Sequence, residues 1–323
     1  MKKIFYLAAV FSVFIIFSSC NENLDPYGTF KDIYVLNCIV RGDSTFQSAT
    51  LTHDYTTTSF NPYSNTTDES IKGATIRIWS GNDKVTILRD TTIPRPAGSL
   101  YQSPYSVYYS NNFQPDPGLP ITIEAILPNG RKLTCSSVVP EDLEINDHEN
   151  LIPPTGRNYL KYSWISNQKN PVYITRLGIY YFKIENGQKV RHIAVVPQSY
   201  TQYNNQWIPV YTKPFSENAL AVDMSLVAKT MELISSGDDN KSNYIILGCI
   251  LEVLSLDPGL SLYYNATARS GDIYSVKLDE TDNTNIQGGY GLFGVYNRNY
   301  SVGFFTHDYI NSFGYIPGLE EGK

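Results

Sequence analysis

The sequence predicts an all-β protein built from two antiparallel β-sandwich domains. Apolar residues alternate with polar ones over short stretches along most of the chain, as they do in half-buried strands. The 26 tyrosines stand in stretches that are also rich in isoleucine, valine and threonine, residue types that favour strands. The 22 glycines and 18 prolines fall largely between these stretches, where they mark turns. A chain of 323 residues with 42% hydrophobic residues can bury two cores.

The first residues predict the secretory signal peptide of a lipoprotein, residues 1–19. Lys2 and Lys3 precede an apolar run over 4–17, and two serines then precede Cys20. The apolar run is too short to cross a bilayer, which takes about 20 residues. We therefore expect lipidation of Cys20, whose acyl chains anchor such proteins to a membrane. A signal peptide cut elsewhere and an uncleaved anchor are the alternatives.

Residues 20–32 are expected to form a tether, and 33–140 to form the first sandwich, which is transthyretin-like or immunoglobulin-like. Leu36 and Cys38 share one face of its first strand by the two-residue period. A stretch rich in threonine, serine and asparagine over 54–70 predicts a loop. The expected strands are 33–40, 48–53, 72–79, 85–88, 101–109, 119–127 and 132–139.

An acidic linker over 141–156 leads to the second domain, 157–323, which is expected to be fibronectin-like. The Asn186-Gly187 pair between two apolar runs predicts a tight hairpin. A last hairpin is expected to turn at 297–299. The strands of this domain are expected at 159–165, 172–184, 189–196, 207–211, 244–256, 292–296 and 300–305.

Two short helical insertions are predicted in the second domain. Apolar residues recur at helical spacing within 223–236, where Asp223 can cap the start and Gly237 can stop the helix. The second helix, 258–268, begins with a proline directly after Asp257, a favoured position for proline at a helix start.

Three cysteines follow Cys20, an odd number that leaves at least one free thiol or an intermolecular bond. Cys38 and Cys135 are both expected to point into the first core, and the first and last strands of sandwiches often lie side by side. The two thiols could then form a disulfide, provided that their Cα atoms lie within about 7 Å. Cys249 stands in an apolar strand and is expected to be a buried free thiol.

No motif in the sequence predicts a catalytic residue, a metal site or a cofactor. The four histidines lack zinc-ligand spacing, and the chain contains neither a Gly-x-Ser-x-Gly elbow nor a glycine-rich phosphate loop. The oxygen-rich stretch 279–285 resembles a calcium loop, but Thr284 and Tyr290 stand where glycine and glutamate are needed, which favours a solvated loop. A net charge of −6 disfavours nucleic acid as a partner.

An aromatic tract is the candidate contact surface of the first domain, since exposed aromatic rings stack on sugars or pack against partner proteins. The alternative is that half of these rings fill the core. The loop over 54–70 is a second candidate, because loops on a rigid sandwich commonly carry binding. The tract consists of Tyr101, Tyr105, Tyr108, Tyr109 and Phe113.

Four glycines within Asn285–Gly294 indicate positive φ angles or close backbone approach. A structural role, as a bulged start to the last hairpin, is favoured over a binding loop. This segment also carries a resemblance, together with the lipobox, Leu24-Asp25-Pro26, Lys72–Ile78 and Asp257-Pro258 before Tyr263-Tyr264. With these motifs the chain resembles the Bacteroidota lipoproteins called domain of unknown function 4249.

The resemblance implies an all-β lipoprotein without established enzyme activity, in frequent company with TonB-dependent outer-membrane receptors. The leading hypothesis is therefore a non-enzymatic, lipid-anchored protein of the outer membrane, exposed at the cell surface, that assists such a receptor or captures nutrient for it. Glu22 and Asp25 beside the lipid favour surface export. The alternatives are an adhesin or structural module of the envelope, and a hydrolase with an unrecognised site.

Overall fold

The protein is all-β and sandwich-like, as predicted. The computed structural model describes residues 32–54, 69–99, 101, 103–146, 151–204, 206–268 and 284–318. The fold belongs to one compact unit, Ile33–Lys323. The predicted signal peptide and Cys20 lie outside the described residues.

Seven strands of the N-terminal half pair antiparallel in the order β1-β2-β5-β4-β3-β6-β7. Alternate residues of these strands are buried, so Leu36, Ile76, Tyr108 and Ile123 belong to one hydrophobic cluster, which we call core 1. The strands are β1 Tyr34–Arg41, β2 Gln47–His53, β3 Thr75–Ser80, β4 Lys84–Ile93, β5 Tyr105–Ser110, β6 Pro120–Ile126 and β7 Lys132–Val138.

A second hydrophobic cluster, core 2, is formed by the sheet β12-β11-β16-β17 and a three-stranded sheet, β15-β10-β8. Trp164, Tyr173 and Leu251 are among its buried residues. The large-sheet strands are β11 Val172–Glu185, β12 Gln188–Val196, β16 Tyr244–Leu256 and β17 Phe293–Phe305. The smaller sheet contains β8 Glu144–Asn146, β10 Tyr159–Ile165 and β15 Ala219–Asp223. The remaining elements are β9 Leu151–Ile152, β13 Ser199–Tyr203, β14 Gln206–Val210, α2 Met224–Ile234, a 3-10 turn Lys241–Asn243, α3 Pro258–Ala268, α4 His307–Ser312 and β18 Ile316–Pro317.

The local signals for the turn at Asn186-Gly187 and for the two helices are confirmed. Asn186 and Gly187 both have positive φ angles, 51° and 77°, in the tight hairpin between β11 and β12. Asp223 caps α2 by accepting a hydrogen bond from Ser225 N at 2.7 Å. Asp257 does the same for α3, accepting from Leu260 N at 2.9 Å.

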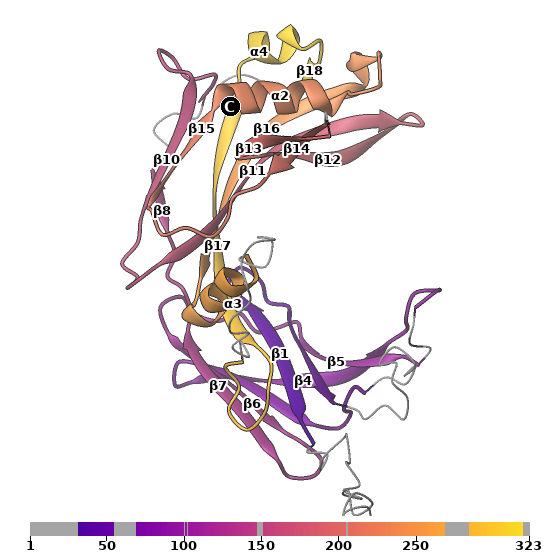
Figure 1. The fold of residues 1–323 in the computed structure, drawn as a ribbon, viewed down its shortest axis with the longest axis vertical. Coiled ribbons are helices and arrows are strands. Elements are labelled where there is room, and N and C mark those ends of the chain that lie inside the picture. The colour runs from indigo at the N-terminus through magenta and orange to yellow at the C-terminus, as the bar shows by residue number, and fades with distance from the viewer. Residues whose placement is uncertain are drawn as a thin grey trace, which may run out of the picture. The chain divides into compact units, whose positions relative to one another are not determined.

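The predicted last hairpin is wrong, because β17 is one continuous strand of 13 residues (Figure 1). The polar residues at its middle resemble a turn in sequence but have partners in the structure. Asn297 Nδ2 donates to Asp142 Oδ1 at 2.7 Å, and Asn299 Oδ1 accepts from Leu143 N at 3.1 Å. Arg298 Nε lies 2.8 Å from Asp43 Oδ2, and its Nη1 lies 3.3 Å from Glu252 Oε1.

The strand β17 also pairs parallel with β1, so the large sheet is mixed rather than purely antiparallel. This pairing brings Phe293 and Val295 into core 1, although both belong to the predicted second domain. The two cores therefore do not follow the division of the sequence into 33–140 and 157–323.

The glycine-rich segment before β17 joins the two ends of the seven-strand path. Gln287 exchanges two backbone hydrogen bonds with Thr134 of β7, at 2.8 and 3.0 Å. Tyr290 N donates to Tyr34 O and Tyr290 O accepts from Leu36 N, both at 2.8 Å and both on β1. The segment thus lies between β1 and β7 and closes the sheet around core 1, which confirms a structural role but not the hairpin expected for it.

The glycines are needed because the backbone of this segment lies against neighbouring backbone. Gly291 has a φ angle of 114°, and a Cβ atom there would lie 2.1 Å from Leu36 O. At Gly288, a Cβ atom would lie 2.4 Å from Lys132 O. These distances are far below van der Waals contact, so even alanine cannot fit without displacing a strand.

We predict that Gly291→Ala lowers the free energy of unfolding by about 3 kcal/mol or more, because left-handed strain adds to overpacking. The matched control is Gly130→Ala in the turn between β6 and β7, where φ is 81° and nothing lies within 4 Å of the added Cβ. The control should lose only about 1–2 kcal/mol from strain. Urea unfolding followed by tryptophan fluorescence measures both losses, and equal losses would contradict the proposed closure.

Candidate functional site

The structure corrects part of the predicted aromatic contact surface. Tyr108 and Phe113 are fully buried in core 1, so they cannot contact a partner. The Tyr108 hydroxyl accepts from Ala74 N at 3.1 Å and donates to Ile71 O at 2.7 Å, which satisfies it inside the protein. Strand alternation in β5 places Tyr108 inward, and Phe113, which follows the end of β5, is buried in the same core, as the alternative interpretation expected for half of the tract.

The other three rings of the tract are partly exposed. Tyr101 and Tyr105 each lie 4.8 Å from the guanidinium of Arg95, within cation–π range. Tyr109 stacks on Phe46 with 6.1 Å between ring centroids. Of the second candidate surface, the loop over 54–70, residues 55–68 lie outside the described part of the chain.

No disulfide joins Cys38 and Cys135, and both are free thiols in core 1. The prediction that β1 and β7 are direct neighbours fails because the glycine-rich segment lies between them. Cys249 is free and buried, as expected. Burial raises the pKa of Cys38 and of Cys249 to about 12, so these thiols are protonated at neutral pH and are poor nucleophiles.

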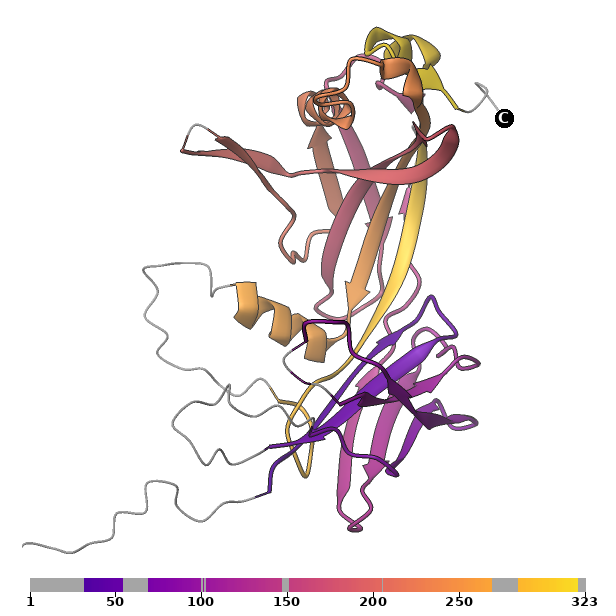
Figure 2. The ribbon, with the colours of Figure 1, turned by 90° about the vertical axis from the view of Figure 1, so that its right-hand side faces the viewer.

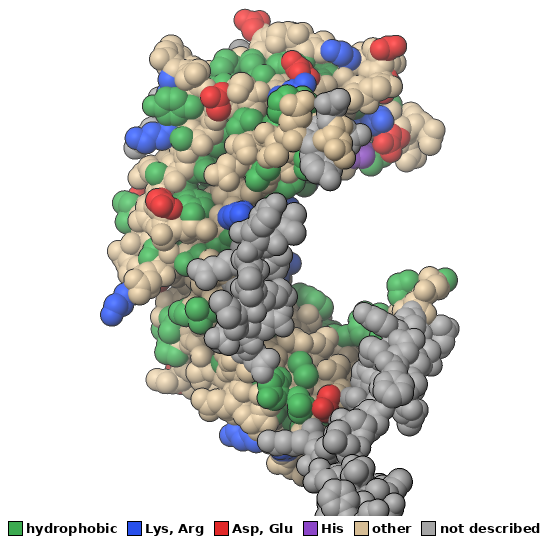
Figure 3. Space-filling model, in the orientation of Figure 1, with side chains coloured by type: hydrophobic (Ala, Val, Ile, Leu, Met, Phe, Trp, Pro, Cys, Tyr) green, Lys and Arg blue, Asp and Glu red, His purple; other side chains and the backbone are tan. Residues whose placement is uncertain are grey.

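Within the described ranges, no group of three or more histidine, cysteine or acidic residues could hold a metal ion. None of the helices described is long and apolar enough to cross a membrane. Acidic and basic side chains are scattered over the face seen in Figure 3, without a single charged patch.

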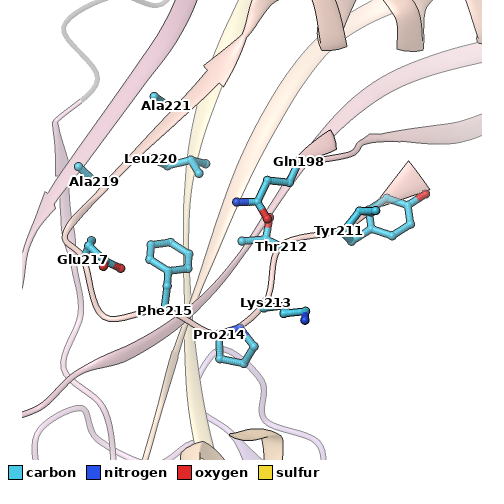
Figure 4. Close-up of a pocket in the computed structure, with 11 residues that line it drawn as sticks. Gln198, Tyr211, Thr212, Lys213, Pro214, Phe215, Glu217, Ala219, Leu220 and Ala221 are labelled. Carbon is cyan, nitrogen blue, oxygen red and sulfur yellow. The ribbon is translucent and has the colours of Figure 1, made fainter. Parts of the chain in front are cut away.

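A pocket of about 490 Å³ lies beside β15, in the size range of small-ligand sites. In Figure 4, the residues of β15 lie on one side, Gln198 and Thr212 lie on the other, and the ring of Phe215 points into the space between them. The lining residues are Gln198, Val210, Tyr211, Thr212, Lys213, Pro214, Phe215, Glu217, Ala219, Leu220 and Ala221.

The floor of this pocket is fixed by core 2. Phe215 and Tyr173 exchange two backbone hydrogen bonds, at 2.8 and 3.0 Å, which hold the coil after β14 against β11. The ring of Phe215 packs 6.1 Å from that of Trp164 and 6.2 Å from that of Tyr173. On the other side, Gln198 N donates to Val210 O at 2.8 Å. The apolar floor is therefore preformed, while Lys213 and Glu217 bring opposite charges to the exposed rim.

One wall of the pocket is the edge strand β15, whose only strand partner in the described structure is β10. Asn218 O accepts from Trp164 N at 3.0 Å, and Met224 N donates to Asn158 O at 2.8 Å. Because hydrogen-bonded pairs alternate in antiparallel sheets, the backbone groups of Ala219 and Ala221 point away from β10. Both residues line the pocket and are exposed.

A smaller cavity of about 30 Å³ adjoins the pocket, since Gln198, Thr212 and Leu220 line both. Thr175 is only 5% exposed and lines this smaller cavity, and its hydroxyl has no hydrogen-bond partner among the residues that the structure describes. Thr175 lies between Leu177, which pairs with β12, and Tyr173, which pairs with Phe215. Between these two paired residues, the cavity beside Thr175 is large enough to hold one water molecule.

The sequence did not predict this site. Residues 207–211 appeared only as a short edge strand interrupted by proline. The β13–β14 hairpin extends away from both sheets (Figure 2), and Trp207 on it is 62% exposed. One sequence feature could have indicated the site: the aromatic residues Trp207, Tyr211 and Phe215 stand among prolines in a segment without regular alternation.

No family model matches the chain, and no curated protein matches it at a significant level. The resemblance drawn from the sequence motifs therefore stays a prediction.

We predict that Thr175→Val does not destabilise the protein and raises the free energy of unfolding by up to about 1–2 kcal/mol, because it removes a buried hydroxyl without a partner. The matched control is Thr230→Val in α2, where the buried hydroxyl donates to Leu226 O at 2.8 Å. The control should lose about 0.5–1.5 kcal/mol. Urea unfolding measures the free energy of unfolding of both variants. If Thr175→Val lowered it as much as Thr230→Val does, the Thr175 hydroxyl would have a partner.

Proposed function

We propose that this protein is a non-enzymatic lipoprotein of the outer membrane, exposed at the cell surface, that uses the pocket beside β15 to hold a partner or ligand for a TonB-dependent receptor. The observation that carries the proposal is the preformed apolar pocket with an unpaired strand edge as one wall. Such a wall offers directional hydrogen bonds, while the floor around Phe215 offers apolar contact.

The proposed location rests on the amino-terminal sequence. Lys2, Lys3 and the apolar run ending before Cys20 support lipidation, and the family resemblance supports a receptor as the partner. A lipid tether confines the protein near other membrane proteins, which raises effective concentrations toward the millimolar range for short flexible links. A modest interface is then sufficient to hold a complex.

An adhesin is the second candidate, supported by one observation. The β13–β14 hairpin carries Trp207 and Ile208 in exposed positions, and the exposed Tyr211, directly after β14, lines the pocket. Exposed aromatic residues on a projecting hairpin suit attachment to a surface as well as capture for a receptor.

We predict that Cys20→Ala releases the protein from membranes or leaves an unprocessed precursor, because no acyl chain can be attached. Each buried acyl methylene contributes about 0.8 kcal/mol to membrane binding, so its loss is decisive. Cys135→Ala is the control and should leave membrane attachment unchanged. Membrane fractionation with acyl labelling tests this, and an unlabelled wild-type protein with unchanged attachment of Cys20→Ala would contradict lipidation.

We predict that Ala219→Arg lowers recovery of the receptor at least fivefold when the lipoprotein is affinity-purified in mild detergent, because the long cation fills the pocket. The control, Ala97→Arg, makes the same change at an exposed position on the chain between β4 and β5. Consistent absence of a receptor with wild-type protein, when surface exposure is confirmed, would overturn receptor assistance and favour the adhesin.

A further inference from the structure

We infer that the pocket receives an extended segment of a partner polypeptide, which adds to β15 as a fourth strand of the β15-β10-β8 sheet. This inference rests on the proposed function, because it specifies the chemistry of what the pocket holds. It follows from hydrogen-bond direction, from the space beside the edge, from the lack of edge protection and from the side chains around the pocket.

The hydrogen bonds of β15 leave one side of the strand available. Leu220 and Val222 direct their backbone groups toward Tyr162 and Leu160 of β10, as the register and the flanking bonds require. Ala219 and Ala221 therefore direct two N–H groups and two C=O groups to the opposite side. In the part of the chain that the structure describes, no hydrogen bond reaches these groups. These groups can be satisfied by another strand, because its backbone presents donors and acceptors with the same spacing.

The space beside this edge is the pocket itself. An added strand lies about 4.8 Å from its neighbour, so it needs open volume along the edge rather than a deep cavity. Ala219 and Ala221 both line the pocket and have small side chains that do not obstruct the approach. Five residues of β15 are available for pairing, which matches a short linear segment.

The edge also lacks the features that usually protect sheet edges from pairing. Charged residues, especially lysine, and prolines commonly prevent such pairing. The edge strand β12 of the large sheet carries Lys189 and Arg191. In contrast, the only charged residue of β15 is Asp223, at its end, where the carboxylate accepts the capping bond from Ser225 N.

The side chains around the pocket indicate which segment fits. Residues of an added strand alternate between two faces, so every second side chain would face the floor at Phe215 and Leu220 and should be apolar. Lys213 and Glu217 stand at the rim, which favours a segment that carries one acidic and one basic residue. The unpartnered hydroxyl of Thr175 lies in the adjoining smaller cavity, where a small polar group or a bridging water can satisfy it.

The test uses the full chain, expressed from its own gene, purified in mild detergent and used to select binders from a phage-displayed library of random octapeptides. The strongest binder is synthesised and titrated against three proteins: wild type, Ala221→Pro and Ala221→Ser. Proline removes the free N–H at the edge but leaves the bonds to β10, which Leu220 and Val222 make, and edge strands tolerate proline. We expect Ala221→Pro to weaken binding at least tenfold and Ala221→Ser to change it less than threefold.

A second measurement does not depend on the folding of the proline variant. Each residue of the octapeptide is N-methylated in turn, and affinity is measured against wild-type protein. Strand addition predicts losses at every second position, because only alternate N–H groups face β15. No enrichment over an unrelated bait, equal affinity for a folded Ala221→Pro protein, or losses without a two-residue period would each overturn the inference.

The outcomes separate this inference from the proposed function. Loss of the strand-addition signature with receptor recovery intact overturns strand addition alone. A peptide that binds with the expected pattern, from a protein that recovers no receptor, overturns receptor assistance and leaves strand addition standing.

Discussion

The structure depends on one parallel strand pairing between chain segments that are far apart in sequence. Residues Cys38 to Arg41 of β1 pair with Phe293 to Tyr296 of β17, and the preceding segment reaches from β1 to β7. This arrangement closes the first sheet around core 1, while the other half of β17 pairs with β16 in core 2. Because the closing segment lies against neighbouring backbone, glycine is required at Gly288 and Gly291. Both cores therefore need the last third of the chain.

A polar network accompanies the passage of β17 between the two cores. Glu252 is 8% exposed and lies between two guanidinium groups, with Arg176 Nη2 at 2.5 Å and Arg298 Nη1 at 3.3 Å. Nearby, Asp257 accepts a hydrogen bond of 2.5 Å from Ser137 of β7 while it caps α3. Burial raises the pKa of Asp257, and these hydrogen bonds to its carboxylate oppose that shift. A carboxylate is stable in a buried position only when its oxygens are paired or hydrogen-bonded. Here the bonds of Glu252 link β16 to β11 and β17, and the bonds of Asp257 link β7 to the start of α3.

The candidate site lies at an unpaired edge strand of an open sheet. Sheets that do not close have edges, and an edge is either protected or available for binding. The first sheet has its ends joined by the glycine-rich segment, and β12 carries charges, whereas β15 faces a preformed pocket with small, uncharged residues. The same core 2 contacts that stabilise Phe215 also fix the floor of the site, so binding requires little rearrangement.

The sequence by itself determined the elements whose signals are local. A long apolar run predicted β16, the Asn186-Gly187 pair predicted the β11–β12 hairpin, and Asp223 with Gly237 predicted the position of α2, because each signal depends on residues within one turn, helix or strand. Only the tertiary structure decided the role of β17, where Asn297 resembles a turn residue but is satisfied by Asp142, 155 residues away. It also decided that Tyr108 is buried and that the edge of β15 faces a pocket. Strand order and burial are set by contacts between distant segments, and a local pattern does not specify which segments meet.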